Sequence, residues 1–498
     1  RDPASRARQP SAMILLAASL PILLSAGALL FLKQSAVRAG LLGLLTALLV
    51  ALAIVPFRLT MEGMGEAVLR GGLTTLIVAY VLLGGVLLYH VMRLGGALEA
   101  LSAATARAIP DPAHRLLTLI FGVSVFFESA TGFGIGIVVC APLFLALGFP
   151  PLRAAFLSLL GQCAVPWGAL AIGTTLGSEL SGVESRDLGI WGALFSFPFI
   201  FLCGALALVV GGLWQPLTRR LLQLLAYAAL LVAVLAAVSR WLGVELAGIL
   251  GGLAVLSLGL LCGRRALKEE EESLSRVLLL RALAPVVVLV LGLLLTRLLP
   301  PLAEWSRSLL RLEIERFDYS LPLLYHPGFW MVVAALAGGL LLPLPQREIP
   351  RMVQQAGRQW LVATLAVAGF LCMAQVMFDA GMVTLLAQSL TSALTEDFVL
   401  LAPFIGALGG FLTASNAGAN AMFMQLQTSS AEALKLPLEP IAAAQNAAAA
   451  NATLASPGRV VLAALVTHCG GQEDHLMRRG LLLVTVGTGA ISLMLALL

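Results

Sequence analysis

The stretch Leu116–Leu147 reads LLTLIFGVSVFFESATGFGIGIVVCAPLFLAL, and it shows most directly what kind of fold this chain adopts. Both of its ends are apolar enough to lie in a lipid bilayer, yet its centre holds a carboxylate, hydroxyl groups and several glycines. Irregular polar backbone at membrane depth is tolerated only where it is buried in protein or lines a cavity. We therefore expect a re-entrant hairpin or a broken helix, with its break at Glu128–Gly136.

The composition of the whole chain indicates that its solvent is lipid. Of the 498 residues, 59% are hydrophobic and only 11% are charged, whereas charged residues make up about a quarter of a soluble domain. Apolar runs long enough to cross a bilayer, about 20 residues, recur along the chain, so a water-soluble protein is excluded. We predict an all-α polytopic membrane protein with about 12 transmembrane helices. The twelve predicted crossings are Met13–Leu32, Leu41–Phe57, Gly71–Met92, Leu152–Thr175, Ile190–Trp214, Leu221–Ser239, Trp241–Gly263, Val277–Thr296, Pro327–Leu344, Gln359–Phe378, Pro440–Thr467 and Gly480–Leu498.

A second apolar stretch, Val399–Leu426, is interrupted in the same way, by Thr413–Asn420. The two breaks align at an offset of 285 residues, which places Phe126 on Phe411 and Glu128 on Thr413. Weak internal symmetry around interrupted helices is the usual sequence pointer to the binding site of a transporter. We therefore predict two repeats, each with one broken-helix hairpin.

The charged loops predict the topology and the division of the chain. Twelve crossings place both termini on one side, and placing them outside puts most short Lys- and Arg-bearing loops inside, as the positive-inside rule requires. An odd number of crossings separates equivalent helices, so the repeats are predicted to be inverted. The predicted parts are a polar leader (1–12), a first half (13–263) with its hairpin at 116–147, a charged cytoplasmic linker (264–276), and a second half (277–498) with its hairpin at 399–426.

Glu128 is the only carboxylate inside either break. Carboxylates within a membrane are costly, and they usually face the bundle interior and mark an ion or proton path. We predict that Glu128 couples transport to protons; the alternative is a structural carboxylate that ties the break to a neighbouring helix. The backbone and hydroxyl groups nearby, helped by half-helix dipoles, are suited to a small anion. These candidate substrate ligands are Ser129, Thr131, Gly132 and Gly134.

The second break and the polar stretch after it are neutral. Carboxamides and hydroxyl groups can hydrogen-bond a carboxylate and a neighbouring hydroxyl together, although the same groups also stabilise irregular backbone without touching a substrate. The candidates here are Ser415, Asn416, Asn420, Asn446, Asn451 and Ser456.

Arg459 is a rare cation near an apolar segment, two residues after Pro457. It is either the anchor of a substrate carboxylate or an interface residue whose side chain reaches toward water. Gln162, in the irregular helix after the first hairpin, is placed to reach the same site.

Other classes of function find little support in the sequence. It contains no HExxH, GxSxG or P-loop motif and no cluster of metal ligands, so we expect neither an enzyme nor a cofactor other than the proton. The net charge of +5 is scattered over loops and does not indicate nucleic-acid binding.

The two breaks resemble the lactate permease family of bacterial transporters. Phe126–Gly134 is similar to the Glu-Gly-Ala-Ala-Gly-Phe-Gly signature of that family, and Phe411–Ala421 to its second signature. Asn446 and Ser456-Pro457 match a third segment. The resemblance implies a multi-pass protein of the bacterial cytoplasmic (inner) membrane that imports lactate, glycolate or similar 2-hydroxy monocarboxylates by proton symport.

The chain departs from this pattern at three places. Ser129 stands where the family usually has Gly, and Ala417–Ala419 where it has Thr-Ser-Ser. A Gly-Lys pair before Ser456 is absent, and we hypothesise that Arg459 replaces its charge. A sodium-coupled carrier of another organic anion and a passive anion channel remain alternatives. The expected partners are the carboxylate, the proton and the lipid bilayer, and the sequence leaves open whether the protein is a homodimer.

Overall fold

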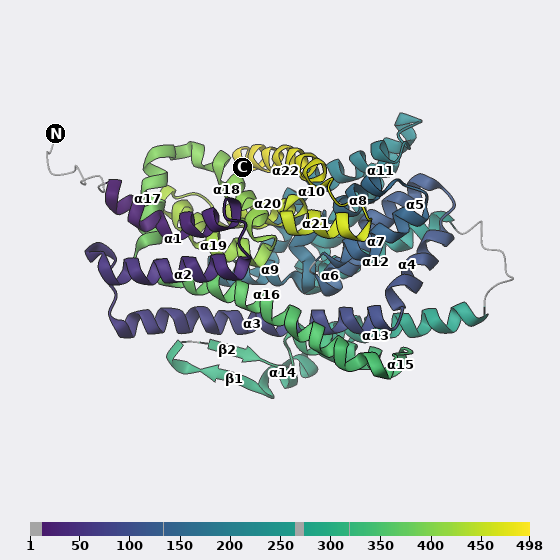
Figure 1. Cartoon of the computed structure of the whole chain (residues 1–498), viewed down its shortest axis with the longest axis horizontal. Coiled ribbons are helices and arrows are strands. Elements are labelled where there is room, and N and C mark those ends of the chain that lie inside the picture. The colour runs from purple at the N-terminus through teal and green to yellow at the C-terminus, as the bar shows by residue number, and fades with distance from the viewer. Residues whose placement is uncertain (1–11, 133, 264–272, 318) are drawn as a thin grey trace.

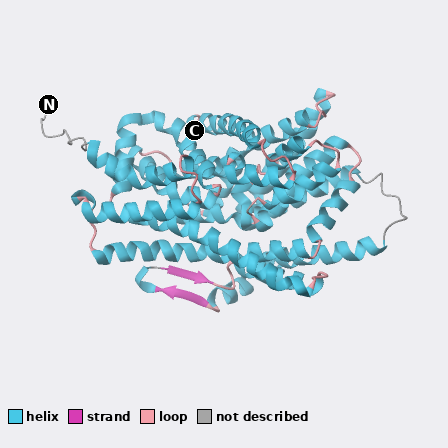
Figure 2. Ribbon diagram, in the orientation of Figure 1, coloured by secondary structure: helices cyan, strands magenta, loops and turns pink. Residues whose placement is uncertain are grey.

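A computed structural model describes residues 12–132, 134–263, 273–317 and 319–498 of the chain. The described residues form a bundle of helices with one small hairpin at its edge (Figures 1 and 2). Residues 1–11 of the predicted leader (1–12) and 264–272 of the predicted linker (264–276) lie outside the described residues, whereas 273–276 form the start of helix α13 (Ser273–Leu298). The predicted all-α membrane fold is confirmed.

The first half contains helices α1 to α12. Their bounds are α1 Ala12–Leu30, α2 Ala36–Ala53, α3 Met61–Leu94, α4 Ala97–Ala108, α5 Pro112–Thr118, α6 Val125–Thr131, α7 Ile135–Ala146, α8 Pro151–Leu160, α9 Gly168–Ser181, α10 Ser185–Val210, α11 Leu217–Trp241 and α12 Val244–Gly263.

The second half contains the remaining helices and both strands. Their bounds are α13 Ser273–Leu298, α14 Pro300–Ser308, β1 Arg311–Ile314, β2 Tyr319–Pro322, α15 Pro327–Leu341, α16 Ile349–Asp379, α17 Met382–Leu394, α18 Phe398–Thr413, α19 Asn416–Leu434, α20 Leu438–Ala452, α21 Pro457–Val466 and α22 Glu473–Ala496. The strands β1 and β2 pair antiparallel, with Arg311 opposite Pro322.

Ten of the described helices are long and apolar enough to cross a membrane, or twelve spans if two bent helix pairs are counted. The number of spans agrees with the prediction, but the helices that form them differ in part from the predicted crossings. Helix α15 has only 15 residues, fewer than the predicted crossing Pro327–Leu344 requires. The arm Pro112–Thr131 of the first hairpin is instead a continuous 20-residue span, with a π-helical turn at Leu119–Ser124.

Two predicted crossings, Leu152–Thr175 and Pro440–Thr467, are broken rather than continuous. Helices α8 and α9 meet at 65°, and α20 and α21 at 41°. A proline stands at each break, Pro166 in the first and Pro457 in the second. Because proline disfavours helical geometry in the residue before it, Ser456 is extended, with ψ at 143°.

The order of elements in the first half recurs in the second at the offset of 285 residues. The long helices α3 and α16 occupy equivalent stretches and are followed by Gly96 and Gly381, which both have left-handed φ angles (67° and 76°). The pairs α4 and α17, α8–α9 and α20–α21, and α10 and α22 also correspond. The inversion of the halves stays a prediction.

Helices α2 and α3 both pack against α16 (Figure 1). The backbones of α2 and α16 meet at Gly40 and Gly369, where a Cβ atom added to Gly40 would lie 3.2 Å from the Cα atom of Gly369. Small residues at such contacts allow helices in a membrane to approach closely. This group of helices forms one wall of the cavity described below.

Candidate functional site

The site lies where the two interrupted helices meet the two bent spans. Helix α6 ends at Thr131 and is followed by Gly132, whose φ of 78° suits glycine, and α7 begins after Gly134. In the second half, α18 ends at Thr413, and Ser415 caps α19 by accepting a hydrogen bond from Gly418. Both predicted breaks are therefore present, and each exposes helix ends to the interior of the bundle.

A buried ion pair joins the two halves. The Nη2 atom of Arg459, in the first turn of α21, lies 3.2 Å from the Oε1 atom of Glu128 in α6, and both side chains are less than a tenth exposed. Arg459 also donates a short hydrogen bond to Gln162. Arg459 is thus inside the bundle, and its alternative interpretation as an interface residue is wrong.

Glu128 is surrounded by donors. Besides Arg459, the backbone N–H groups of Gly134 and Gly136, at the start of α7, lie 3.3 and 3.4 Å from its carboxylate oxygens. An ionised carboxylate only accepts hydrogen bonds, and the positive end of a helix dipole stabilises it further. In this conformation the carboxylate of Glu128 therefore has donors from both halves of the chain.

An amide network crosses the halves on the other side of the site. The Oδ1 atom of Asn446 accepts hydrogen bonds from Asn416 (2.9 Å) and Asn420 (2.8 Å), and its Nδ2 atom donates to Thr174 (3.0 Å). Asn420 also donates to the carbonyl oxygen of Gly173 (2.9 Å). Helix α9 of the first half is thereby held by side chains from the second.

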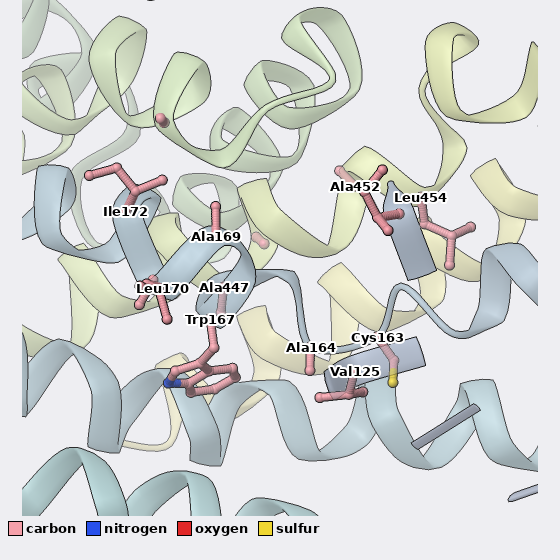
Figure 3. Close-up of a cluster of buried hydrophobic side chains, with 14 of the residues drawn as sticks. Val125, Cys163, Ala164, Trp167, Ala169, Leu170, Ile172, Ala447, Ala452 and Leu454 are labelled. Carbon is pink, nitrogen blue, oxygen red and sulfur yellow. The ribbon is translucent and has the colours of Figure 1, made fainter. Parts of the chain in front are cut away.

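The bent span of the first half has an unusual backbone at this point. Ala169, Leu170 and Ala171 have φ angles of 47°, 53° and 56°, which form a left-handed turn without glycine. Such geometry costs about 1–2 kcal/mol per residue, so the surrounding packing must maintain it. Figure 3 shows this turn within the hydrophobic core, near Trp167 and Ala447.

A cavity of about 610 Å³ opens beside the ion pair. Five of the predicted site residues line it: Glu128, Gly132, Ser415, Asn416 and Arg459. The other predicted residues are buried but do not line the cavity: Ser129, Thr131, Gly134, Gln162, Asn420, Asn446, Asn451 and Ser456.

Two of these buried residues that do not line the cavity form hydrogen bonds with backbone groups nearby in the sequence. Thr131 donates to the carbonyl oxygen of Phe127 (2.6 Å) within α6, and Ser456 donates to that of Thr453 (2.6 Å) in the turn before α21, so both hydroxyl groups have backbone partners close by in the sequence. Asn451 is buried, and within the described part of the chain neither of its amide atoms has a hydrogen-bond partner.

The sequence analysis missed one wall of the cavity, which α16 provides. Gln355, Arg358 and Gln359 line it near the start of that helix, and Gln359 lies 3.0 Å from His90 of α3. The spacing of these polar residues along one helical face is a signal that the sequence offers, but the predicted crossing begins only at Gln359, whereas α16 begins at Ile349.

The helices, paired breaks and buried charge pair define a polytopic membrane transporter rather than an enzyme. A family model described as L-lactate permease matches residues 14–313 and 311–498. The chain belongs to this family.

Curated relatives cover nearly the whole chain at modest identity. An L-lactate permease of Halalkalibacterium halodurans is 25% identical over 93% of this chain and 92% of its own length. An L-lactate permease of Escherichia coli (strain K12) is 23% identical over 93% and 92%. A glycolate permease of the same organism is 22% identical over 93% and 91%.

Proposed function

We propose that this protein imports small 2-hydroxy monocarboxylates, such as lactate or glycolate, by proton symport across the bacterial cytoplasmic membrane. The names of its relatives, L-lactate permease and glycolate permease, support the substrate class. The observation that carries the coupling is the buried pair of Glu128 and Arg459 in the wall of the cavity.

The charge of this pair explains why a proton must accompany the anion. The pair is neutral in sum, and a substrate carboxylate would add a negative charge to a site where an unpaired ion costs several kcal/mol. If a proton neutralises Glu128, Arg459 is released to bind the substrate carboxylate, and the site stays neutral. By linkage, the proton and the anion then tighten each other's binding by the same factor.

The second break supplies a group for the 2-hydroxyl. The Oδ1 atom of Asn416 is buried and has no hydrogen-bond partner among the described residues, and Asn416 lines the cavity. A buried acceptor without a donor is unfavourable, and a hydroxyl group is a donor that would satisfy it. The same hydroxyl would distinguish 2-hydroxy acids from plain monocarboxylates.

The cavity opens near Ser35 and Arg358, which lie at the starts of α2 and α16. The positive-inside assignment places both on the cytoplasmic side. This location supports an inward-facing conformation, from which the substrate leaves to the cytoplasm.

Purified protein in liposomes tests the proposal. An imposed pH gradient without sodium should drive accumulation of labelled lactate or glycolate. In Glu128→Gln, which resembles the protonated side chain, exchange of internal for external substrate should persist, while accumulation driven by the pH gradient should be lost.

Glu245→Gln is the matched control, because Glu245 forms an ion pair with Arg297 (3.2 Å) away from the site. This variant should still accumulate substrate. If Glu128→Gln accumulates substrate with only a pH gradient, Glu128 has a structural role. Sodium dependence would favour the sodium-coupled carrier, and the absence of any concentrative uptake would favour the channel.

A further inference from the structure

The cavity is larger than the proposed substrates need. Its volume of about 610 Å³ falls within the range of about 300–1,000 Å³ that holds drug-sized ligands, whereas glycolate and lactate are among the smallest organic anions. A substrate anchored at Arg459 and Asn416 would leave most of this space unfilled.

The surplus space has an apolar wall built by one face of α16. Val362, Ala363, Ala366, Val367 and Phe370 all line the cavity, and their spacing of one and three residues is that of a single helical face. This face begins just after the polar residues Gln355, Arg358 and Gln359, so the helix changes from polar to apolar as it runs along the cavity.

Residues from two further helices extend this apolar wall. Val78 and Leu82, four residues apart, contribute from α3, and Ile172 contributes from α9. The polar side chains of the breaks come from other elements, since Glu128 belongs to α6, Asn416 to α19 and Arg459 to α21. The cavity therefore combines a polar surface made by the breaks with an apolar surface made by α16 and its neighbours.

We infer that the site also binds 2-hydroxy monocarboxylates with longer aliphatic tails, acids of about four to six carbons in total, and binds them more tightly than lactate. The inference rests on the proposed function, because the carboxylate and the hydroxyl would occupy the same polar groups. The tail would lie against the α16 wall, and each buried CH₂ group should tighten binding about fourfold.

A homologous series of inhibitors tests this inference. Glycolate, lactate, 2-hydroxybutyrate, 2-hydroxypentanoate and 2-hydroxyhexanoate would compete with labelled lactate for exchange in liposomes. We expect the half-inhibitory concentration to fall about fourfold per added CH₂ group over the first steps. A constant or rising value from lactate onward would overturn the inference.

Two variants of the wall check that the tail binds there. Ala363→Phe should fill the space and remove the gain in inhibition that the longer acids show over glycolate. Val362→Thr keeps nearly the same volume but adds a hydroxyl group, so it should reduce the gain per CH₂ group even if Ala363→Phe folds poorly. An unchanged gain in both folded variants would contradict binding at this wall.

The series also separates this inference from the proposed function. If glycolate and lactate compete and the longer acids do not, only the tail inference is wrong. If none of the acids competes, the proposed substrate class is wrong as well.

Discussion

The two interrupted helices hold equivalent places in their halves but present different chemistry. The first break carries Glu128, whose carboxylate contacts a cation and the start of α7. The equivalent residue in the second half is Thr413, whose hydroxyl group lies within hydrogen-bonding distance of the carbonyl oxygens of Gly409 (2.8 Å) and Ser415 (2.9 Å). One break is built around a charge and the other around neutral hydrogen bonds.

Each break is nevertheless completed by the opposite half. Arg459 belongs to the second half and pairs with the carboxylate of the first, while Asn420 belongs to the second half and binds the backbone of α9 in the first. We infer a division of roles, in which the first break senses the proton and the second recognises the substrate hydroxyl. In this proposal, the contacts between the halves would couple the two events.

The largest effect should follow from Arg459→Gln, which removes the cation between the halves. Glu128 would then be buried without its charged partner, and breaking a buried ion pair by removing one member costs about 3–5 kcal/mol. We expect low folded yield, a lowered unfolding temperature and no uptake. This is more severe than the rise in apparent KM that a substrate anchor alone would give.

The double variant Glu128→Gln/Arg459→Gln separates folding from transport. Replacing both members of the pair removes the unpaired charge, so thermal stability should recover most of its loss while uptake stays absent. Wild-type stability in the single variant Arg459→Gln would show that the pair does not hold the halves together.

A smaller effect should follow from Asn446→Ala in the amide network. This change would leave donors of Asn416 and Asn420 without their acceptor, at a cost of about 1–3 kcal/mol for an unsatisfied buried group. We expect an apparent KM for lactate raised about tenfold, with proton coupling retained. Uptake measured as a function of lactate concentration, with and without a pH gradient, would show both.

Asn451→Ala is the matched control for this prediction. Asn451 lies in the same helix and is equally buried, but within the described residues its amide forms no hydrogen bond. Its replacement should change the apparent KM less than that of Asn446. The reverse order would move substrate recognition away from the network.

The sequence predicted the membrane fold and both breaks because these depend on local composition. Small polar and glycine residues inside apolar stretches mark a break whatever the partner, so the ends of α6 and α18 fell where the pattern placed them. The bends at Pro166 and Pro457 were harder to predict, because proline also occurs in continuous membrane helices, where neighbouring groups satisfy the freed backbone groups.

The contacts across the site could not be predicted, because they depend on tertiary packing. Glu128 and Arg459 are 331 residues apart, and nothing near either residue identifies the other as its partner. The left-handed turn at Ala169–Ala171 has no local signal at all, because alanine strongly prefers the right-handed region. The α16 wall could not be predicted either, because the sequence does not show which face of that helix lies toward the breaks.

The smallest effect should come from Arg358→Gln at the mouth of the cavity, which tests whether charge outside the breaks matters. Arg358 is exposed and, among the described residues, forms no ion pair or hydrogen bond, so its charge is available to attract an entering anion. An exposed charge accelerates association mainly at low ionic strength, because the Debye length shrinks from about 30 Å at 0.01 M salt to about 8 Å at 0.15 M. We expect initial exchange rates, measured from the side on which the cavity opens, to fall about twofold to threefold at low salt and to equal wild type at high salt. Arg351→Gln is the control, because Arg351 is also exposed on α16 but does not line the cavity, and it should leave the rate unchanged at both salt concentrations. A loss that persists at high salt would mean that Arg358 contacts the substrate directly, and the division of roles between the two breaks would then have to include the α16 wall.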